Sequence, residues 1–280
     1  MHLFKYFEPA RLDVIESGCI RLTQPIDFND PFELKPVTST CGIKDAMPDL
    51  SSTEENLGSY NKIDKLPIKA TSPDSEFKVI KANKNLLEEQ QVLATSPPET
   101  NGVTGETSGQ NQGEVIGVLC LTEEPDNLLM WSHYADSHQG FCVKFDTSNY
   151  FFNQKRTMED DFYHLRKVEY IEQHPTKVIK SNVGVDLLLH KSDTWSHEKE
   201  WRFCAVLHDS DMLIECADSD IHLFKYPKEI IKEIILGANA SEELADKIKT
   251  IIDQTPEFSH VKLSKAYIAE KSYRLEFKSL

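Results

Sequence analysis

A long polar stretch divides the chain and limits which residues can build its core. Ser, Thr, Pro, Asn, Gly and Glu dominate from about residue 38 to residue 113. Such a composition buries too little apolar surface to offset the entropy that ordering would cost. We therefore predict a single α+β domain over residues 1–280, with a partly disordered insertion at 38–113. Residues 78–93 within it are rich in Leu, Lys and Glu, which predicts a helix.

Outside that stretch, short strands and helices follow one another without a regular βαβ repeat. Apolar runs and alternating patterns predict strands at residues 3–7, 19–22, 115–121, 140–146, 167–171, 200–207, 227–236 (after a turn), 261–268 and 273–277. Helices are predicted at residues 9–16, 127–135, 183–191 and 241–252. Asp126 and Ser241 are the expected N-caps of two of these helices. This order favours a mixed, mainly antiparallel sheet with packed helices, which is the α+β class.

Composition excludes several classes of partner. The formal net charge of −15 argues against general binding to nucleic acid or to a membrane surface, because phosphates are neutralised by basic patches. The six cysteines include no Cys-x-x-Cys pair, and several of them sit in apolar stretches, which indicates reduced thiols. The N-terminus is too short and polar for a signal peptide, and no apolar run could span a membrane. We therefore predict a cytoplasmic location.

The segment from Glu198 to Arg202 combines charge with strand-like alternation. Side chains alternate between the two faces of a strand, so Glu198, Glu200 and Arg202 would share one face. Trp201 and Phe203 would then fill the other face as core. Two carboxylates beside a guanidinium can shift a glutamate pKa into a catalytic range. An equally weighted alternative is a solvated strand face with a Glu–Arg pair.

The predicted helix at 127–135 carries a second group of candidates. Trp131 and Tyr134 can pack inward at helical spacing, which leaves His133 on another side of the helix. A single histidine on a helix is more often structural than functional. His133, His138 and Asp136 resemble a set of metal ligands, but their spacing fits no zinc template. We therefore expect no metal site.

A turn-rich loop from Phe28 to Glu33 forms the third candidate. Asn29 and Asp30 can bond to their own backbone, and two phenylalanines can anchor the turn to the core. An anchored turn would also fix a polar side chain that points at a ligand. The sequence lacks a Gly-x-Gly-x-x-Gly motif, a Walker-type loop and a Gly-x-Ser-x-Gly elbow. These absences disfavour Rossmann enzymes, P-loop enzymes and α/β-hydrolases.

Three groups of motifs together resemble the bacterial domain-of-unknown-function family 2971 (DUF2971). They are Lys5-Tyr6 with Phe28–Glu33; Cys120-Leu-Thr-Glu-Glu with Met130–Asp136 and Gly140–Asp146; and Trp195–Arg202. The resemblance runs from the N-terminus to about Val206 and more weakly to Leu275. The stretch at 38–113 departs from it.

More distantly, the order of these motifs resembles the ADP-ribosyltransferase-like fold. That resemblance implies a split-sheet core that binds NAD in a cleft between two small sheets, with NAD as substrate. A late glutamate of the family orients the nicotinamide ribose and stabilises positive charge as nicotinamide leaves. It implies Glu200 as the catalytic residue and Glu198 as its partner. The implied binding residues are Lys5, Tyr6 (where the family often carries His or Arg), Asn29, Asp30, His133, Tyr134 and Arg202.

Three functional hypotheses follow. The first is an NAD-consuming transferase or glycohydrolase, acting on a small nucleotide as a toxin or phage-defence effector. The second is a metal-dependent or nucleic-acid-processing enzyme that uses His133, Asp136 and the two glutamates. The third is a non-catalytic binding module. Convergence of Lys5, Asn29, Tyr134 and Glu200 on one cleft would strongly favour the enzyme hypothesis.

Overall fold

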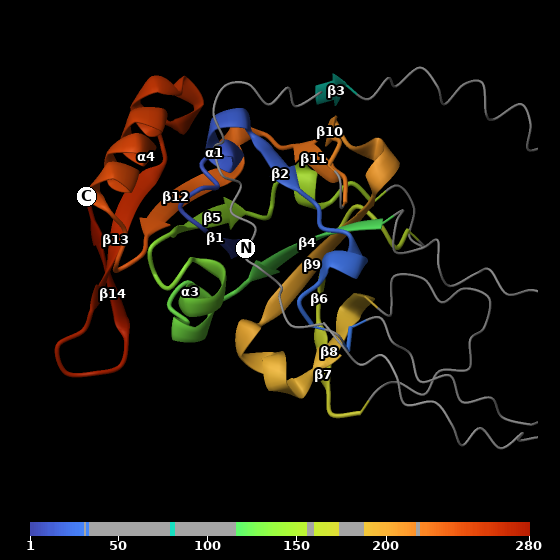
Figure 1. Ribbon diagram of the computed structural model, residues 1–280, viewed down its shortest axis with the longest axis horizontal. Helices are drawn as coiled ribbons and strands as arrows, with labels where there is room; N and C mark the ends of the chain where they lie inside the picture. Colours follow the sequence, from blue (N-terminus) through green and yellow to red (C-terminus); the bar gives the residue numbers. More distant parts are fainter. Residues whose placement is uncertain (31, 34–78, 82–115, 156–159, 174–187, 217–218) are drawn as a thin grey trace, which may run out of the picture.

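Two sheets and a short strand pair form the framework of the protein. The computed structural model describes residues 1–30, 32–33, 79–81, 116–155, 160–173, 188–216 and 219–280 (Figure 1). The main sheet has the strand order β14-β13-β12-β5-β1-β4-β9-β6. Its strands are β1 (His2–Phe7), β4 (Ile116–Thr122), β5 (Phe141–Asp146), β6 (Leu165–Lys167), β9 (Glu200–Val206), β12 (Ile231–Leu236), β13 (Lys262–Ile268) and β14 (Leu275–Ser279).

The second sheet has the order β2-β11-β10-β3, and β7 pairs with β8 separately. These strands are β2 (Cys19–Arg21), β3 (Val79–Lys81), β7 (Glu169–Ile171), β8 (His190–Ser192), β10 (Met212–Ile214) and β11 (Ile221–Lys225). The helices are α1 (Asp13–Ser17), α3 (Leu128–Tyr134) and α4 (Glu242–Gln254), with 3-10 turns η1 (Pro25–Asp27), η3 (Tyr150–Phe152), η5 (Asp193–Glu198), η6 (Leu207–Asp209), η7 (Lys228–Ile230) and η8 (Pro256–Phe258).

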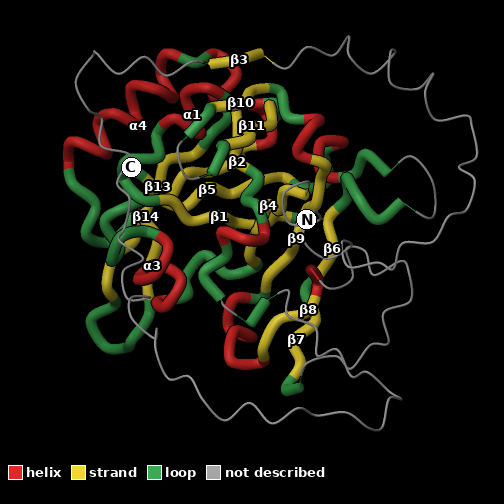
Figure 2. The backbone as a smooth tube through the Cα atoms, turned by 45° about the vertical axis from the view of Figure 1, so that its right-hand side comes forward, coloured by secondary structure: helices red, strands yellow, loops and turns green. Residues whose placement is uncertain are grey.

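Antiparallel pairing dominates, which confirms the predicted α+β class. Within the main sheet only β12 and β13 run parallel, and α4 connects them. A parallel connection needs a crossover of this kind because a hairpin can join only antiparallel strands. Ser241 caps α4, since its side chain accepts a hydrogen bond from the Leu244 amide, as predicted. Figure 2 shows the central strands lying side by side, with helices at the periphery.

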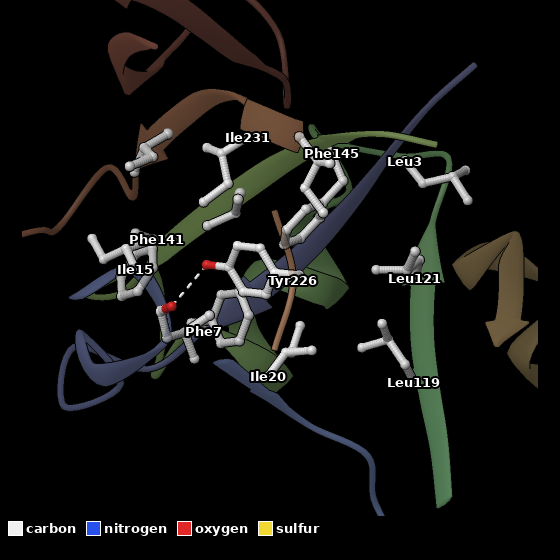
Figure 3. Packing of buried hydrophobic residues seen from close by; sticks show 14 of the residues in the cluster. Leu3, Phe7, Ile15, Ile20, Leu119, Leu121, Phe141, Phe145, Tyr226 and Ile231 are labelled. Carbon is white, nitrogen blue, oxygen red and sulfur yellow. Dashed lines mark hydrogen bonds between the residues drawn. The ribbon is translucent and has the colours of Figure 1, made fainter. Parts of the chain in front are cut away.

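Both faces of the main sheet are buried, and a different hydrophobic cluster packs on each face. Leu3 and Phe7 of β1 join the largest hydrophobic cluster, which extends to Phe141 and Tyr226 (Figure 3). The Tyr226 hydroxyl donates to the Val14 carbonyl at 2.7 Å, so its polar atom is satisfied inside that core. The alternate side chains of β1 point to the opposite face and pack with Trp131 of α3.

Several predicted elements differ from the structure. Asn127, not Asp126, caps α3, because its side chain accepts from the amides of Leu129 and Met130. The strand predicted at 167–171 is divided into β6 and β7. Its break lies at Val168, whose amide donates to the Glu200 carbonyl at 2.9 Å.

The prediction of a helix at 183–191 is wrong for its last residues. His190 and Lys191 belong to β8, which pairs in parallel with β7, so a tertiary contact overrides the local helical pattern. Residues 183–187 lie outside the described residues. The same is true of most of the stretch at 38–113; of its predicted helix at 78–93, only Val79–Lys81 are described, and they form β3.

Two further observations concern the helices and the cysteines of the described residues. None of the helices in the described ranges is both long and apolar enough to cross a membrane. The cysteines within those ranges carry free thiols, while Cys41 lies outside them.

Candidate functional site

A cavity of about 280 Å³ lies against β1, β4 and β9, on the face of the main sheet opposite the largest core. The loop that follows β2 and residues of α3, β8 and η5 complete its walls. The lining residues are Phe4, Lys5, Tyr6, Thr23, Asp27, Phe28, Asn29, Glu33, Val118, Cys120, Leu121, Thr122, Met130, Tyr134, Lys191, Glu198, Glu200 and Arg202.

The alternation of β9 brings its charged side chains to this cavity. Glu200 and Arg202 line it, whereas Phe203 belongs to the core on the other face. Glu198 was predicted to lie on the strand, but it ends the 3-10 turn η5 instead. Its side chain still reaches the cavity. Lys199, with φ 43°, separates the two glutamates. The alternative of a solvated face is wrong, because Glu198, Glu200 and Arg202 are only 3%, 4% and 1% exposed.

Five charged side chains form a buried cluster along one wall. The Arg202 guanidinium donates from Nε to Glu200 at 2.8 Å and from Nη2 to Glu33 at 2.9 Å. Lys191 Nζ donates to Glu198 at 2.6 Å and to Glu200 at 3.1 Å, and lies 3.4 Å from Glu33. Three carboxylates therefore share two cations, which leaves the directly bonded cluster with one excess negative charge when all five groups are ionised.

The cluster decides how these carboxylates titrate. Burial opposes ionisation of Glu200, but attraction to Arg202 and Lys191 outweighs it and lowers the pKa to about 2. Burial raises the pKa of Glu33, against the opposing pull of Arg202 and Lys191. Burial also disfavours the charged form of Lys191, yet Glu200, Glu198 and Glu33 together raise the pKa of this amine. Glu200 is thus a buried carboxylate that stays ionised at neutral pH.

A hydrogen-bond chain joins the third motif to the cluster. Asn29 Nδ2 donates to the Tyr134 hydroxyl at 3.3 Å, and that hydroxyl donates to Glu198 Oε1 at 2.7 Å. Burial, together with the negative charge of Glu198, raises the pKa of Tyr134, so the phenol remains a neutral donor. The loop, the helix and the turn before β9 therefore meet at Glu198.

Lys5 and Tyr6 line the cavity, but their polar atoms already donate hydrogen bonds to backbone carbonyls. Lys5 Nζ donates to the Cys120 carbonyl at 3.1 Å, and burial lowers the pKa of the amine. The cross-strand partner of Lys5, Val143, belongs to the largest core, so the lysine side chain leaves β1 on the core face. The Tyr6 hydroxyl donates to the Glu124 carbonyl at 2.5 Å. Both residues thus hold the cavity wall together.

The structure gathers seven of the nine predicted site residues at one cavity: Lys5, Tyr6, Asn29, Tyr134, Glu198, Glu200 and Arg202. Asp30 and His133 do not line it. Asp30 Oδ1 instead accepts from the Phe32 amide, which is the predicted self-bonded turn, and His133 is exposed on α3. Within the described ranges, no three His, Cys, Asp or Glu side chains are grouped so that they could hold a metal ion.

Sequence reasoning missed Glu33 and Lys191. Glu33 was visible as the last residue of the Phe28–Glu33 motif, and its acidic side chain at the end of an anchored loop was an available signal. Lys191 gave no signal, because the local pattern placed it at the end of a helix.

Acid should destabilise the protein through Glu200. Its pKa is about 2 when folded, against an ordinary 4.5, so its stabilisation is complete above pH 4.5 and is lost as the pH falls towards 2. We expect the free energy of unfolding to drop by on the order of 3 kcal/mol across this window. Glu33, whose pKa is raised, acts with the opposite sign and above pH 4.5, where rising pH costs stability. Urea titrations at pH 5 and pH 2 measure the effect, and an equal drop in the Glu200→Gln variant would exclude Glu200 as its source.

Comparison with known proteins found a match for one segment of the chain only. No curated protein and no solved structure matches the chain. Residues 130–203 match the family model described as a protein of unknown function (DUF2971). The matched segment begins in α3 and ends in β9, so it contains Tyr134, Lys191 and the Glu198–Arg202 motif of the cavity. The match is limited to these residues, and over them it agrees with the resemblance to DUF2971 seen in the motifs.

Proposed function

We propose that the cavity binds the nicotinamide–ribose end of NAD and that the protein cleaves the bond between them. The observation that carries the proposal is that Asn29, Tyr134 and Glu200, which come from separate motifs, line one cavity. In the reaction, the bond from the nicotinamide nitrogen to ribose C1 breaks, and its electron pair stays on nicotinamide. The oxygen of water or of an acceptor hydroxyl then bonds to C1 and loses its proton.

The electrostatics of the cavity support this chemistry. Positive charge develops on the ribose ring as nicotinamide leaves, and a carboxylate held ionised by burial among fixed cations favours that charge. Glu200 is such a carboxylate. The oxidised nicotinamide ring is itself cationic, and the excess negative charge and the aromatic walls of Phe4, Phe28 and Tyr134 suit a flat cation.

The size of the cavity limits what can enter it. Ligand pockets commonly range from about 300 to 1,000 Å³, so a cavity of about 280 Å³ fits one ring with its sugar and not a whole dinucleotide. The adenosine part of NAD would therefore extend beyond the described walls. In this proposal, the main sheet and the second sheet correspond to the two sheets of an ADP-ribosyltransferase-like core.

The cost of the charge cluster also favours a functional site. Burying ions is expensive, and well-packed apolar residues often replace buried ion pairs without loss of stability. Five charged side chains lining a cavity are therefore a costly way to build a scaffold, whereas perturbed charges beside a cavity are common at sites of catalysis.

A cleavage assay tests the proposal. Purified protein should release nicotinamide from NAD, and Glu200→Gln should lower the rate roughly 10²–10³-fold, as losses of one electrostatic stabiliser do. Glu229→Gln, at an exposed glutamate of η7, is the matched control and should keep full activity. Circular dichroism and thermal melts establish that each variant folds. A wild-type protein that neither binds nor cleaves NAD sinks the proposal, as does a fully active Glu200→Gln variant.

The same variants test the cellular setting that we propose, a cytoplasmic toxin or phage-defence effector. Expression of the wild type should lower cellular NAD and slow bacterial growth, while Glu200→Gln should do neither. An identical growth defect with both proteins would separate any toxicity from NAD cleavage.

A second candidate function is a non-catalytic binding module. The observation that favours it is that both carboxylate oxygens of Glu200 already accept hydrogen bonds from Arg202 and Lys191. A carboxylate so occupied can shape a binding cavity without taking part in chemistry. NAD that raises the melting temperature but is never cleaved, with Glu200→Gln unchanged in affinity, would favour the module.

A further inference from the structure

The strand β14, red in Figure 1, is the last strand of the main sheet, and in the part of the chain that the structure describes its outer edge is open. Among the described strands, only β13 pairs with it. Its Glu276, Lys278 and Ser279 are exposed. Open edges are templates for pairing, and proteins usually blunt them with proline, with bulges or with lysine. β14 has no proline, and its pairing with β13 runs in one register throughout. Its lysine is accompanied by a glutamate on the same face.

The hydrogen bonds to β13 establish which backbone groups of β14 are unpaired at this edge. Ala269 N donates to Arg274 O at 3.0 Å, and Leu280 N donates to Leu263 O at 2.9 Å. In an antiparallel pair, successive residues alternate between bonding to the neighbour and pointing away from it. The even-numbered residues of β14 therefore bond to β13. The amides and carbonyls of Leu275, Phe277 and Ser279 point to the open edge.

We propose that β14 pairs antiparallel with β14 of a second copy of this chain, centred on Phe277. This register places Phe277 opposite itself and Leu275 opposite Ser279, so that every outward backbone group finds a partner. Glu276 then faces Lys278 of the second copy, and the two-fold axis repeats the pair. Directly opposed side chains of a non-hydrogen-bonded pair are the closest in a sheet, which favours opposite charges there.

Charge selects this register over its neighbours. The next registers that keep the outward groups paired centre on Glu276 or on Lys278. The first would oppose two glutamates, and the second would oppose two lysines. Like charges at directly opposed positions destabilise a sheet. Only the register centred on Phe277 joins unlike charges at both positions.

Sedimentation equilibrium of the full chain over micromolar to millimolar concentrations tests the proposal. Physiological ionic strength is needed, because the net charge of −15 on each copy otherwise repels the other. The wild type should show a monomer–dimer equilibrium. Lys278→Glu should weaken the dimer at least 10-fold. With this change, Glu276 of each copy faces a glutamate at position 278 of the other copy, so like charges meet at both places. The double variant Glu276→Lys/Lys278→Glu should restore it, since the swap regenerates both unlike pairs.

Lys247→Glu is the matched control. It makes the same charge change on α4, where Lys247 pairs with Glu243 on the surface, and it should leave the dimer constant unchanged. Circular dichroism verifies folding of each variant. A wild type that stays monomeric throughout, a dimer that survives Lys278→Glu, or a double variant that fails to recover would each overturn the proposal.

Discussion

Replacing Arg202 with methionine should lower the free energy of unfolding by roughly 3–5 kcal/mol, the cost of removing one partner from a buried ion pair. The guanidinium is 1% exposed and bonds to Glu200, to Glu33 and to the Leu188 carbonyl. Methionine can fill much of the space but leaves two carboxylates without their principal counter-charge. Those carboxylates must then be protonated or hydrated, and either costs stability.

Urea denaturation at pH 7 measures the loss. Lys167→Met is the control, because Lys167 pairs with Glu123 on the surface, where such pairs contribute only about 0–1 kcal/mol. Adding Glu200→Gln to Arg202→Met should recover part of the loss, since one uncompensated charge is removed. A loss below about 1 kcal/mol would mean that solvent already screens the cluster.

Replacing Trp131 with alanine should cost about 3–5 kcal/mol, the usual range for a buried aromatic residue. Trp131 is fully buried, packs edge-on against Tyr6 with ring centroids 5.0 Å apart, and donates from Nε1 to the Pro125 carbonyl at 2.8 Å. Its removal leaves a cavity between α3 and the main sheet, beside Tyr134. The damage should therefore reach the candidate site as well as the stability.

Two comparisons sharpen this experiment. Trp131→Phe keeps a ring in the site and should cost less than the alanine variant. Trp201→Ala should also cost less, because Trp201 is only half-buried and packs at the margin of the core. Thermal melts and urea titrations rank the three variants. If Trp201→Ala proved the most damaging, the inferred division between core and margin would be wrong.

The local pattern predicted elements whose stability depends on their own sequence. β4 and β9 follow from apolar runs and alternation, and α4 from Ser241 and the apolar face behind it. The polar face of β9 was also predictable, since alternation alone places Arg202 and Phe203 on opposite faces of the strand. The burial of the charged side chains on this face was not predictable, because it depends on a distant loop whose residue Glu33 bonds to Arg202.

What could not be predicted depends on contacts between distant segments. Lys191 lies at the cavity because β8 pairs with β7, and nothing in its own neighbourhood signals that pairing. His133 and Tyr134 are adjacent in sequence, yet only Tyr134 reaches the cavity. Which side of α3 faces the sheet is decided by the packing of Met130 and Trp131. A resemblance in motif order located the site, but only the fold could choose among neighbouring residues.

The span of these contacts has a consequence for folding. Arg202 meets Glu33 across 169 residues, Asn29 meets Tyr134 across 105, and Tyr134 meets Glu198 across 64. Closing such long loops costs entropy before any contact compensates for it, so the complete cluster requires these distant segments to have come together. A chain in which these segments have not met would lack the complete cavity. The presence of the cavity thus marks a chain whose assembly is complete, and a ligand bound there stabilises only that state.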